Sequence, residues 1–387
     1  AFNLVAVADE ATEVDLTPTF EWEAATDPEG GDVTYDLYLD TSDDPATTIA
    51  SDLTGTTFEL TERLSLIENY SWKVIAKDAE GNETSSDVFS FETRTIRFPA
   101  QAVTEDAAFG ERNNHASAVF DGKIWVVGGS NNSGVLNSVW NSSDGENWNL
   151  VNENSDFEKR SRSELIVFNN KLWLIGGTNF NNIRLGDIWS SSDGSNWTLE
   201  KDSTSFSPRI NFSAIVFDNK LWLIGGNGTS STGLSEVWNS TNGRDWTLVT
   251  ASVNFGRLTN HTSLVYDGKI WVIGGAGNDS GADDDVWYSS DGVSWTQATD
   301  NAAFGRIRRH TSVVYDNKMW VIGGRDSFGN RLNKVWYSED GATWIEALQD
   351  IPFTPRDRHT SEVYDDKVWI ISGIDETGVL SDVWYFE

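Results

Sequence analysis

The stretch "HTSVVYDNKMWVIGGRDSFGNRLNKVWYSEDGATW", from His310 to Trp344, decides the fold because nearly the same line occurs six times in the chain. Its landmark is an apolar run that ends in glycine, "MWVIGG", which starts at Met319. Equivalent runs start at Ile124, Leu172, Leu221, Ile270 and Val368, so the spacings are 48, 49, 49, 49 and 49 residues. A fixed period near 50 residues indicates a repeat architecture.

Each repeat predicts four short strands. In the quoted copy they are "HTSVVY", "KMWVIGG", "KVWY" and "TWIEA", and turn residues such as "DN" and "SEDG" separate them. Pairs that contain Asn, Asp or Gly tolerate positive φ and suit tight hairpins. One such sheet cannot bury its apolar faces alone, so we expect six sheets to stack around an axis.

The pattern "R..H.S.VYDGKIWVIGG…DVWYSSDG.SWT" resembles the kelch repeat of β-propellers, and it covers roughly three quarters of the chain. The last repeat stops at "VWYFE", before its fourth strand. The stretch "AQAVTEDAAFG" before the first repeat resembles "WTQATDNAAFG" from Trp295. We therefore expect residues 96–103 to supply the outer strand of the last blade, with Ala100 in the position of the missing tryptophan.

The first quarter of the chain lacks this period. It contains "LTPTFEWEA", "VTYDLYLDT" and "YSWKVIAKDAEGN", which alternate between apolar and polar residues. This part resembles a fibronectin type III domain, and the resemblance implies that Tyr70 is its corner tyrosine. The expected fold is all-β: a fibronectin type III-like β-sandwich over residues 1–94, then a six-bladed kelch-type β-propeller over residues 95–387 whose last blade is closed by an N-terminal strand.

Composition excludes several kinds of site. The chain has no cysteine, so it cannot form disulfides or thiolate metal sites, nor the tyrosine–cysteine cofactor that the resemblance to kelch-like copper oxidases would imply. The formal net charge of −32 disfavours binding to nucleic acid. No apolar run approaches the roughly 18 residues of a membrane-spanning helix.

Arginines gather in one class of loop. Because the four strands alternate in direction, the loops that precede each first strand and the loops between the second and third strands share one face of the disc. The first class carries Arg112, Arg160, Arg162, Arg209, Arg257, Arg306, Arg308, Arg309, Arg356 and Arg358. Arginine binds carboxylate or sulfate in a bidentate manner, so one hypothesis is a face that binds anions. The alternative is that each arginine braces its own blade.

Two carboxylates interrupt the pattern of the first strands. Glu362 stands where the other repeats have Ala, Ile, Leu or Val, and Glu164 stands where they have Ala, Ser or Thr. A carboxylate at such a position is typical of a functional site. A salt bridge to a neighbouring arginine also explains it, and we favour the salt bridge. The four histidines, His115, His261, His310 and His359, share one repeat position on different blades, so we expect a packing role rather than a metal site.

Two acidic turns are candidates for Ca²⁺ because calcium prefers oxygen ligands. They are "DSGADDD", with Asp279, Asp283, Asp284 and Asp285, and "DPEGGD", with Asp27, Glu29 and Asp32. Neither matches a defined calcium loop, and we expect solvated turns and no cofactor.

The resemblance to bacterial secreted or cell-surface kelch proteins implies a binding function. We expect a non-catalytic protein whose arginine-bearing face recognises an acidic glycan or a protein partner, with the signal or anchor segment outside this chain. The alternative is a sugar enzyme similar to the sialic-acid mutarotases, which would use arginines together with Glu362 and Glu164. The ligand and the oligomeric state are not fixed by the sequence.

Overall fold

The computed structural model describes residues 2–229, 233–277 and 282–387, and the regular elements of this part are all strands. The chain divides into two compact units, Ala1–Ile96 and Arg97–Glu387. The division lies two residues beyond the boundary expected from the sequence. Within the described ranges there is no helix with the length and apolar character needed to cross a membrane.

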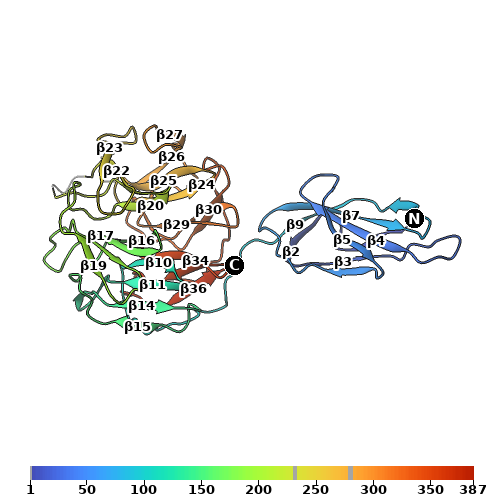
Figure 1. Cartoon of the computed structure of the whole chain (residues 1–387), viewed down its shortest axis with the longest axis horizontal. Coiled ribbons are helices and arrows are strands. Elements are labelled where there is room, and N and C mark those ends of the chain that lie inside the picture. The colour runs from blue at the N-terminus through green and yellow to red at the C-terminus, as the bar shows by residue number, and fades with distance from the viewer. Residues whose placement is uncertain (1, 230–232, 278–281) are drawn as a thin grey trace. The chain divides into compact units, whose positions relative to one another are not determined.

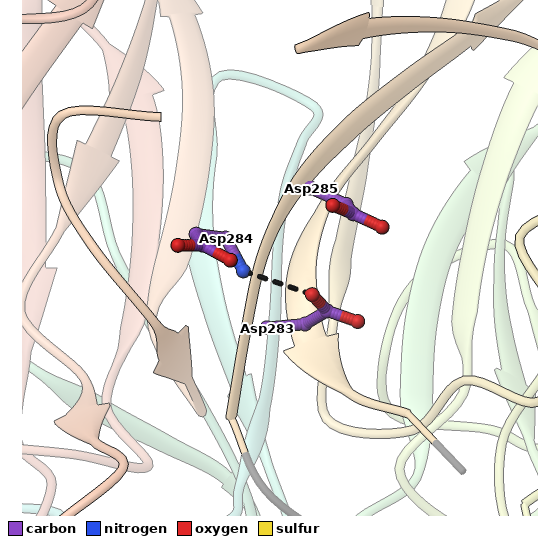
Figure 2. A group of neighbouring side chains, drawn as sticks. All are labelled: Asp283, Asp284 and Asp285. Atoms are coloured by element: carbon purple, nitrogen blue, oxygen red, sulfur yellow. Dashed lines mark hydrogen bonds between the residues drawn. The ribbon is translucent and has the colours of Figure 1, made fainter. Parts of the chain in front are cut away.

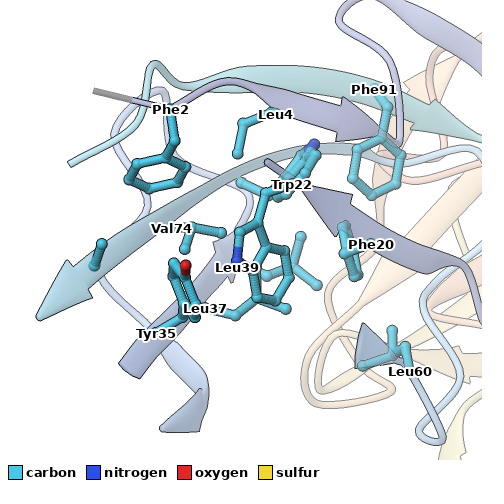
Figure 3. Packing of buried hydrophobic residues seen from close by; sticks show 12 residues of the cluster. Phe2, Leu4, Phe20, Trp22, Tyr35, Leu37, Leu39, Leu60, Val74 and Phe91 are labelled. Atoms are coloured by element: carbon cyan, nitrogen blue, oxygen red, sulfur yellow. The ribbon is translucent and has the colours of Figure 1, made fainter. Parts of the chain in front are cut away.

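The first unit contains two sheets that share one core. Their strand orders are β1-β3-β6 and β2-β9-β7-β4-β5, and β8 pairs with β7. The strands are β1 (Leu4–Ala6), β2 (Ala11–Val14), β3 (Thr19–Trp22), β4 (Thr34–Asp40), β5 (Thr48–Leu53), β6 (Thr57–Glu59), β7 (Asn69–Lys77), β8 (Glu83–Ser85) and β9 (Phe89–Thr93). Phe20 and Trp22 from one sheet pack with Leu37 and Phe91 from the other (Figure 3). The hydroxyl of Tyr70 accepts a hydrogen bond from the Ser65 N–H at 3.2 Å.

The second unit contains six larger antiparallel sheets, which we number 1 to 6 in chain order (Figure 1). Sheets 1 to 3 are β10 (Ala116–Phe120), β11 (Lys123–Val127), β14 (Val139–Ser142) and β15 (Asn149–Asn152); β16 (Glu164–Phe168), β17 (Lys171–Ile175), β18 (Ile188–Ser191) and β19 (Thr198–Lys201); and β20 (Ser213–Phe217), β21 (Lys220–Ile224), β22 (Val237–Ser240) and β23 (Thr247–Thr250). Sheets 4 to 6 are β24 (Thr262–Tyr266), β25 (Lys269–Ala276), β26 (Ala282–Ser289) and β27 (Thr296–Thr299); β29 (Thr311–Tyr315), β30 (Lys318–Ile322), β32 (Val335–Ser338) and β33 (Ile345–Glu346); and β34 (Thr360–Tyr364), β35 (Lys367–Ile371) and β36 (Val383–Phe386). Four short strands lie in the connecting loops: β12 (Ser130–Asn131), β13 (Gly134–Val135), β28 (Ile307–Arg308) and β31 (Arg325–Asp326).

The first strands of the six sheets form a closed ring. Each contacts the first strand of the sheet before it and of the sheet after it, and β34 of sheet 6 contacts β10 of sheet 1. In five of the six sheets the tryptophan of the second strand packs against a turn glycine of the following sheet, whereas Trp320 of sheet 5 packs against Phe386 of sheet 6. A Cβ added to Gly194, which has a φ of +71°, would lie 2.0 Å from the Trp125 ring, and Gly145 stands in the same relation to Trp369 of sheet 6. Glycine is therefore required at these turns, because any side chain would separate neighbouring sheets.

Sheet 6 has three regular strands, and backbone hydrogen bonds join the segment before sheet 1 to the outer strand of this sheet near both ends of that strand. The N–H of Arg97 donates to the Glu387 carbonyl at 2.9 Å, and the N–H of Val383 donates to the Thr104 carbonyl at 2.9 Å. No regular strand lies between these points. The sequence correctly indicated which segments meet, but the closing element is irregular. Phe98, rather than Ala100, packs against the core of this sheet.

Candidate functional site

Two classes of loop interlock on one face of the ring, which we call the loop face. The loop before each first strand pairs with the loop between the second and third strands of its own sheet, as in the bridge between Ser161 and Thr178. It also pairs with the corresponding loop of the preceding sheet, where the N–H of Arg160 donates to the Leu136 carbonyl at 2.9 Å. The structure thus places both classes on one face, as the alternation of strand direction predicted.

Four of the ten predicted arginines are buried braces: Arg112, Arg160, Arg209 and Arg356. Arg160 donates two hydrogen bonds to Asp187, at 2.8 and 2.7 Å, and Arg356 binds Asp382 in the same bidentate manner. Each of the four guanidinium groups also lies over a phenylalanine ring three residues earlier, at 5.0–5.5 Å. These side chains stabilise their own sheets and expose almost no surface, which favours the alternative that each braces its own blade.

Arg162, Arg309 and Arg358 lie at the mouth of the central channel. They occupy the same position in three of the six repeats. In the other three repeats this position holds Asn114, Asn211 and Asn260, and the six residues together form what we call the rim. All six residues have φ between +49° and +60°. Rim residues of adjacent sheets are joined through the backbone, as where the N–H of Arg162 donates to the Asn114 carbonyl at 2.8 Å. Asparagine tolerates this left-handed conformation better than arginine does. The three rim arginines therefore occupy positions that backbone preference alone would give to asparagine.

A cavity of about 410 Å³ beside the rim forms what we call the arginine groove. Five arginines line it: Arg162, Arg184, Arg257, Arg308 and Arg309. No carboxylate lines it among the residues that the structure describes. Burial lowers the pKa of Arg162, and so do the charges of Arg309 and Arg184. The groove thus concentrates positive charge in a protein whose formal net charge is −32.

A second arginine cluster surrounds the buried carboxylate of Asp357. Its partners are Arg331 at 2.9 Å, Arg309 at 3.5 Å, Arg358 at 3.6 Å and Arg325 at 3.9 Å. Burial and the charge of Arg358 together lower the pKa of Arg309 to about 10. Arg309 belongs to both the groove and this cluster, so the two positive regions are continuous.

The sequence prediction missed Arg184, Arg325 and Arg331, because it took arginines only from the loops that precede the first strands. A signal was present: "IRLG" and "NRLN" place Arg184 and Arg331 at the same point of two repeats. Of the remaining predicted arginines, Arg306 is exposed and lies 3.7 Å from Asp284, outside the groove. The Nε atoms of Arg308 and Arg325 are buried and have no hydrogen-bond acceptor in the described part of the chain.

Glu164 and Glu362 both line the central channel, a cavity of about 240 Å³. Glu362 accepts a hydrogen bond from the Ser117 hydroxyl at 2.5 Å. Burial raises the pKa of Glu362 to about 7, although this bond opposes the shift. Burial, together with the charge of Glu362, raises the pKa of Glu164 to about 8. The favoured salt bridges to arginine are wrong, because within the described ranges neither carboxylate has a cationic side chain within 4.0 Å.

The histidines pack between adjacent sheets, as predicted. Each is buried, and its Nε2 shares a hydrogen bond with a hydroxyl of the neighbouring sheet, as between His310 and Thr262 at 2.9 Å. A Cβ added to Gly324 would lie 2.7 Å from the Cβ of His310, so the second glycine of "IGG" makes room for the histidine. Burial lowers the pKa of His310 to about 3, which keeps it neutral near pH 7.

Asp283, Asp284 and Asp285 place carboxylate oxygens within 4.8 Å of one another (Figure 2). Burial raises the pKa of Asp285, and so does the charge of Asp283. With one oxygen from each, three carboxylates provide fewer ligands than the 6–8 oxygens that calcium takes. Asp279 lies outside the described residues. In the other acidic turn, Asp27 accepts backbone hydrogen bonds from Glu29 and Gly31, as an ordinary turn does. The expectation of solvated turns without a cofactor thus stays a prediction.

Comparison with known proteins identifies the repeats. Residues 77–226 and 260–387 match the KLHDC2/KLHL20/DRC7 Kelch-repeats domain family, which is more than half of the chain. The chain belongs to the kelch-repeat family. Residues 208–307 of this kelch protein also match a DUF6242 beta propeller domain. A solved structure titled "Structure of YjhT" superposes with a TM-score of 0.62 at 10% identity, over 73% of this chain and 97% of that one. This likeness shows the fold. No curated protein matches the sequence.

Proposed function

We propose that this kelch protein is a non-catalytic binding protein whose loop face recognises an acidic ligand, either a glycan or a protein partner. The arginine groove is the observation that supports the proposal: it has five arginines and no carboxylate among its described lining residues. Guanidinium groups bind carboxylate and sulfate through paired, charge-assisted hydrogen bonds. The negative charge elsewhere repels polyanions at long range, so recognition depends on close contact.

Calorimetric titration with glucuronate, sulfated galactose and neutral galactose tests this proposal. We expect the two acidic sugars to bind and galactose not to bind. Arg308→Ala removes a groove arginine that has no ion pair within the described ranges, so it should weaken binding without unfolding the protein. Lys123→Ala, which removes one positive charge from the opposite face, is the matched control. Preferential binding of galactose, or equal loss in both variants, would contradict the proposal.

A second candidate is a sugar enzyme of the mutarotase type. The observation that favours it is the pair of channel carboxyl groups, whose pKa values of about 8 for Glu164 and about 7 for Glu362 suit proton transfer near neutral pH. The test is NMR measurement of anomer interconversion of sialic acid, with Glu362→Gln as the variant. A rate equal to that in buffer alone would exclude this activity.

We further propose the finer architecture and the location. The six sheets would be the blades of a six-bladed propeller that the segment before sheet 1 closes, and the first unit would be a fibronectin type III-like domain. The sheet order of that unit and the hydrogen bond to the Tyr70 hydroxyl support this assignment. A bacterial cell-surface or secreted protein of this kind would present the loop face to an external ligand. Fractionation of the native host tests the location.

A further inference from the structure

Two hairpins on the loop face share one design. Each lies between the second and third strands of its sheet, the first spanning residues 178–184 in sheet 2 and the second residues 325–331 in sheet 5. Bridges between Thr178 and Arg184 and between Arg325 and Arg331 close their bases. An acidic or amide side chain caps each turn: Asn179 accepts from the Ile183 N–H at 2.9 Å, and Asp326 accepts from the Asn330 N–H at 2.8 Å. Both hairpins are therefore ordered turns with an arginine at the end of the base.

These hairpins lie on opposite sides of the central channel. The first strand of sheet 2, β16, contacts β10 and β20, whereas the first strand of sheet 5, β29, contacts β24 and β34. In a closed ring of six first strands, β16 and β29 are therefore as far apart as two members can be. The rim of the channel lies between them.

The turns of both hairpins expose large apolar side chains. Phe180 is 70% exposed, Ile183 is 58% exposed and Phe328 is 90% exposed. Within the described parts of the six loops of this class, no other large hydrophobic residue is exposed to this degree. The Phe180 ring lies beside Gly134 of the neighbouring loop but stays largely exposed, and exposed aromatic side chains are common where a partner makes contact.

Arginines connect the two turns. Arg184 lines the arginine groove, and Arg331 lies in the cluster around Asp357. Arg309 belongs to both regions, so arginines extend from one hairpin to the other, although Asp357 and Glu376 are carboxylate partners of Arg331 at the second hairpin. Across the mouth of the channel, Phe180 is followed by the arginine groove, then by the arginine cluster around Asp357, and then by Phe328.

We propose that this row binds an acidic polysaccharide chain that lies across the channel mouth from Phe180 to Phe328, an inference that rests on the proposed function. A chain of uronic acids repeats its carboxylate at every sugar, which matches a continuous row of arginines. Its sugar rings have flat apolar faces that stack on phenylalanine at the two ends, and the rim amides of Asn211 and Asn260 can bind its hydroxyl groups. A single acidic sugar reaches the arginine groove only.

The length dependence of binding tests this inference. We expect oligogalacturonates that span both hairpins to bind at least about tenfold more tightly than galacturonic acid, because the second hairpin is engaged intramolecularly. Phe180→Ala and Phe328→Ala should remove most of this gain and leave the affinity for galacturonic acid unchanged. Leu150→Ala, which truncates an exposed side chain on an outer strand, is the matched control.

The outcomes separate the two proposals. If neither galacturonic acid nor its oligomers bind, the proposed function fails. If all lengths bind equally and both phenylalanine variants behave as the wild type, only the present inference fails. If a poly-glutamate peptide binds as tightly as the oligomer, and with the same dependence on Phe180 and Phe328, the ligand is an acidic peptide and the assignment to a polysaccharide is overturned.

Discussion

Phe98 packs against Phe353 with ring centroids 5.8 Å apart, and it takes the place that a tryptophan holds in the five other sheets. In those sheets the equivalent phenylalanine meets, edge to face, the tryptophan just before the fourth strand, as between Phe157 and Trp197 at 5.2 Å. Phe98 also lies 5.4 Å from Phe386 at the end of the chain. One aromatic ring thus joins the segment before sheet 1 to sheet 6.

This contact predicts that Phe98 stabilises the closed ring. Phe98→Ala should lower the free energy of unfolding by about 2–3 kcal/mol, somewhat less than a fully buried phenylalanine costs, because Phe98 is only half-buried. Ala100→Gly, at the exposed position that the sequence favoured, should change it by much less. Urea denaturation of both variants measures the difference. A larger effect at Ala100 would contradict the assignment of Phe98.

Arg160 and Arg162, two residues apart, should behave in opposite ways. Arg160→Met leaves the partly buried Asp187 without its cation, so we expect a loss of about 3–5 kcal/mol in the free energy of unfolding. Arg162→Asn places a residue that tolerates a φ of +58° at the rim, so stability should stay the same or rise by a few tenths of a kcal/mol. Anion binding should fall only in the second variant. Thermal unfolding and calorimetry together check both statements.

Glu164 should make stability depend on pH. Its folded pKa of about 8 lies above the value of about 4.3 for an unfolded glutamate, so the folded protein holds a proton that the unfolded chain loses. This contribution is complete below about pH 4 and disappears as the pH rises to about 8. Relative to the wild type, Glu164→Gln should therefore melt at a similar temperature at pH 4 and a few degrees higher at pH 9. Glu153→Gln, at an exposed position, should show no such difference.

The sequence predicted the elements of the ring because repetition reports local chemistry. Six copies of one strand pattern at one spacing identify strands, hairpin turns and the face that carries the variable loops. Repetition could not show that Arg160 is buried while Arg162 lies at the rim. The two side chains point in different directions because the backbone at Arg162 has a left-handed conformation. It also could not show that Arg184, Arg309 and Arg331 belong to one positive surface, since they come from three loops that only the closed ring brings together. The environment of Glu362 was missed for the same reason: Ser117, its hydrogen-bond donor, lies 245 residues away on the adjacent first strand.

Asp357 should hold the arginine cluster together, and its removal should create a site that small carboxylates fill. Its buried carboxylate lies within 4.0 Å of nitrogen atoms of Arg309, Arg325, Arg331 and Arg358. Asp357→Ala leaves these charges to repel one another, so we expect a loss of about 3–5 kcal/mol in the free energy of unfolding. Because the vacated space has the size and partners of a carboxylate, acetate should restore stability to the variant more than chloride does at equal ionic strength, and it should have little effect on the wild type. Thermal melts in the two salts measure this rescue. Equal effects of acetate and chloride on the variant would show that screening alone relieves the repulsion and that the cluster has no preference for carboxylate.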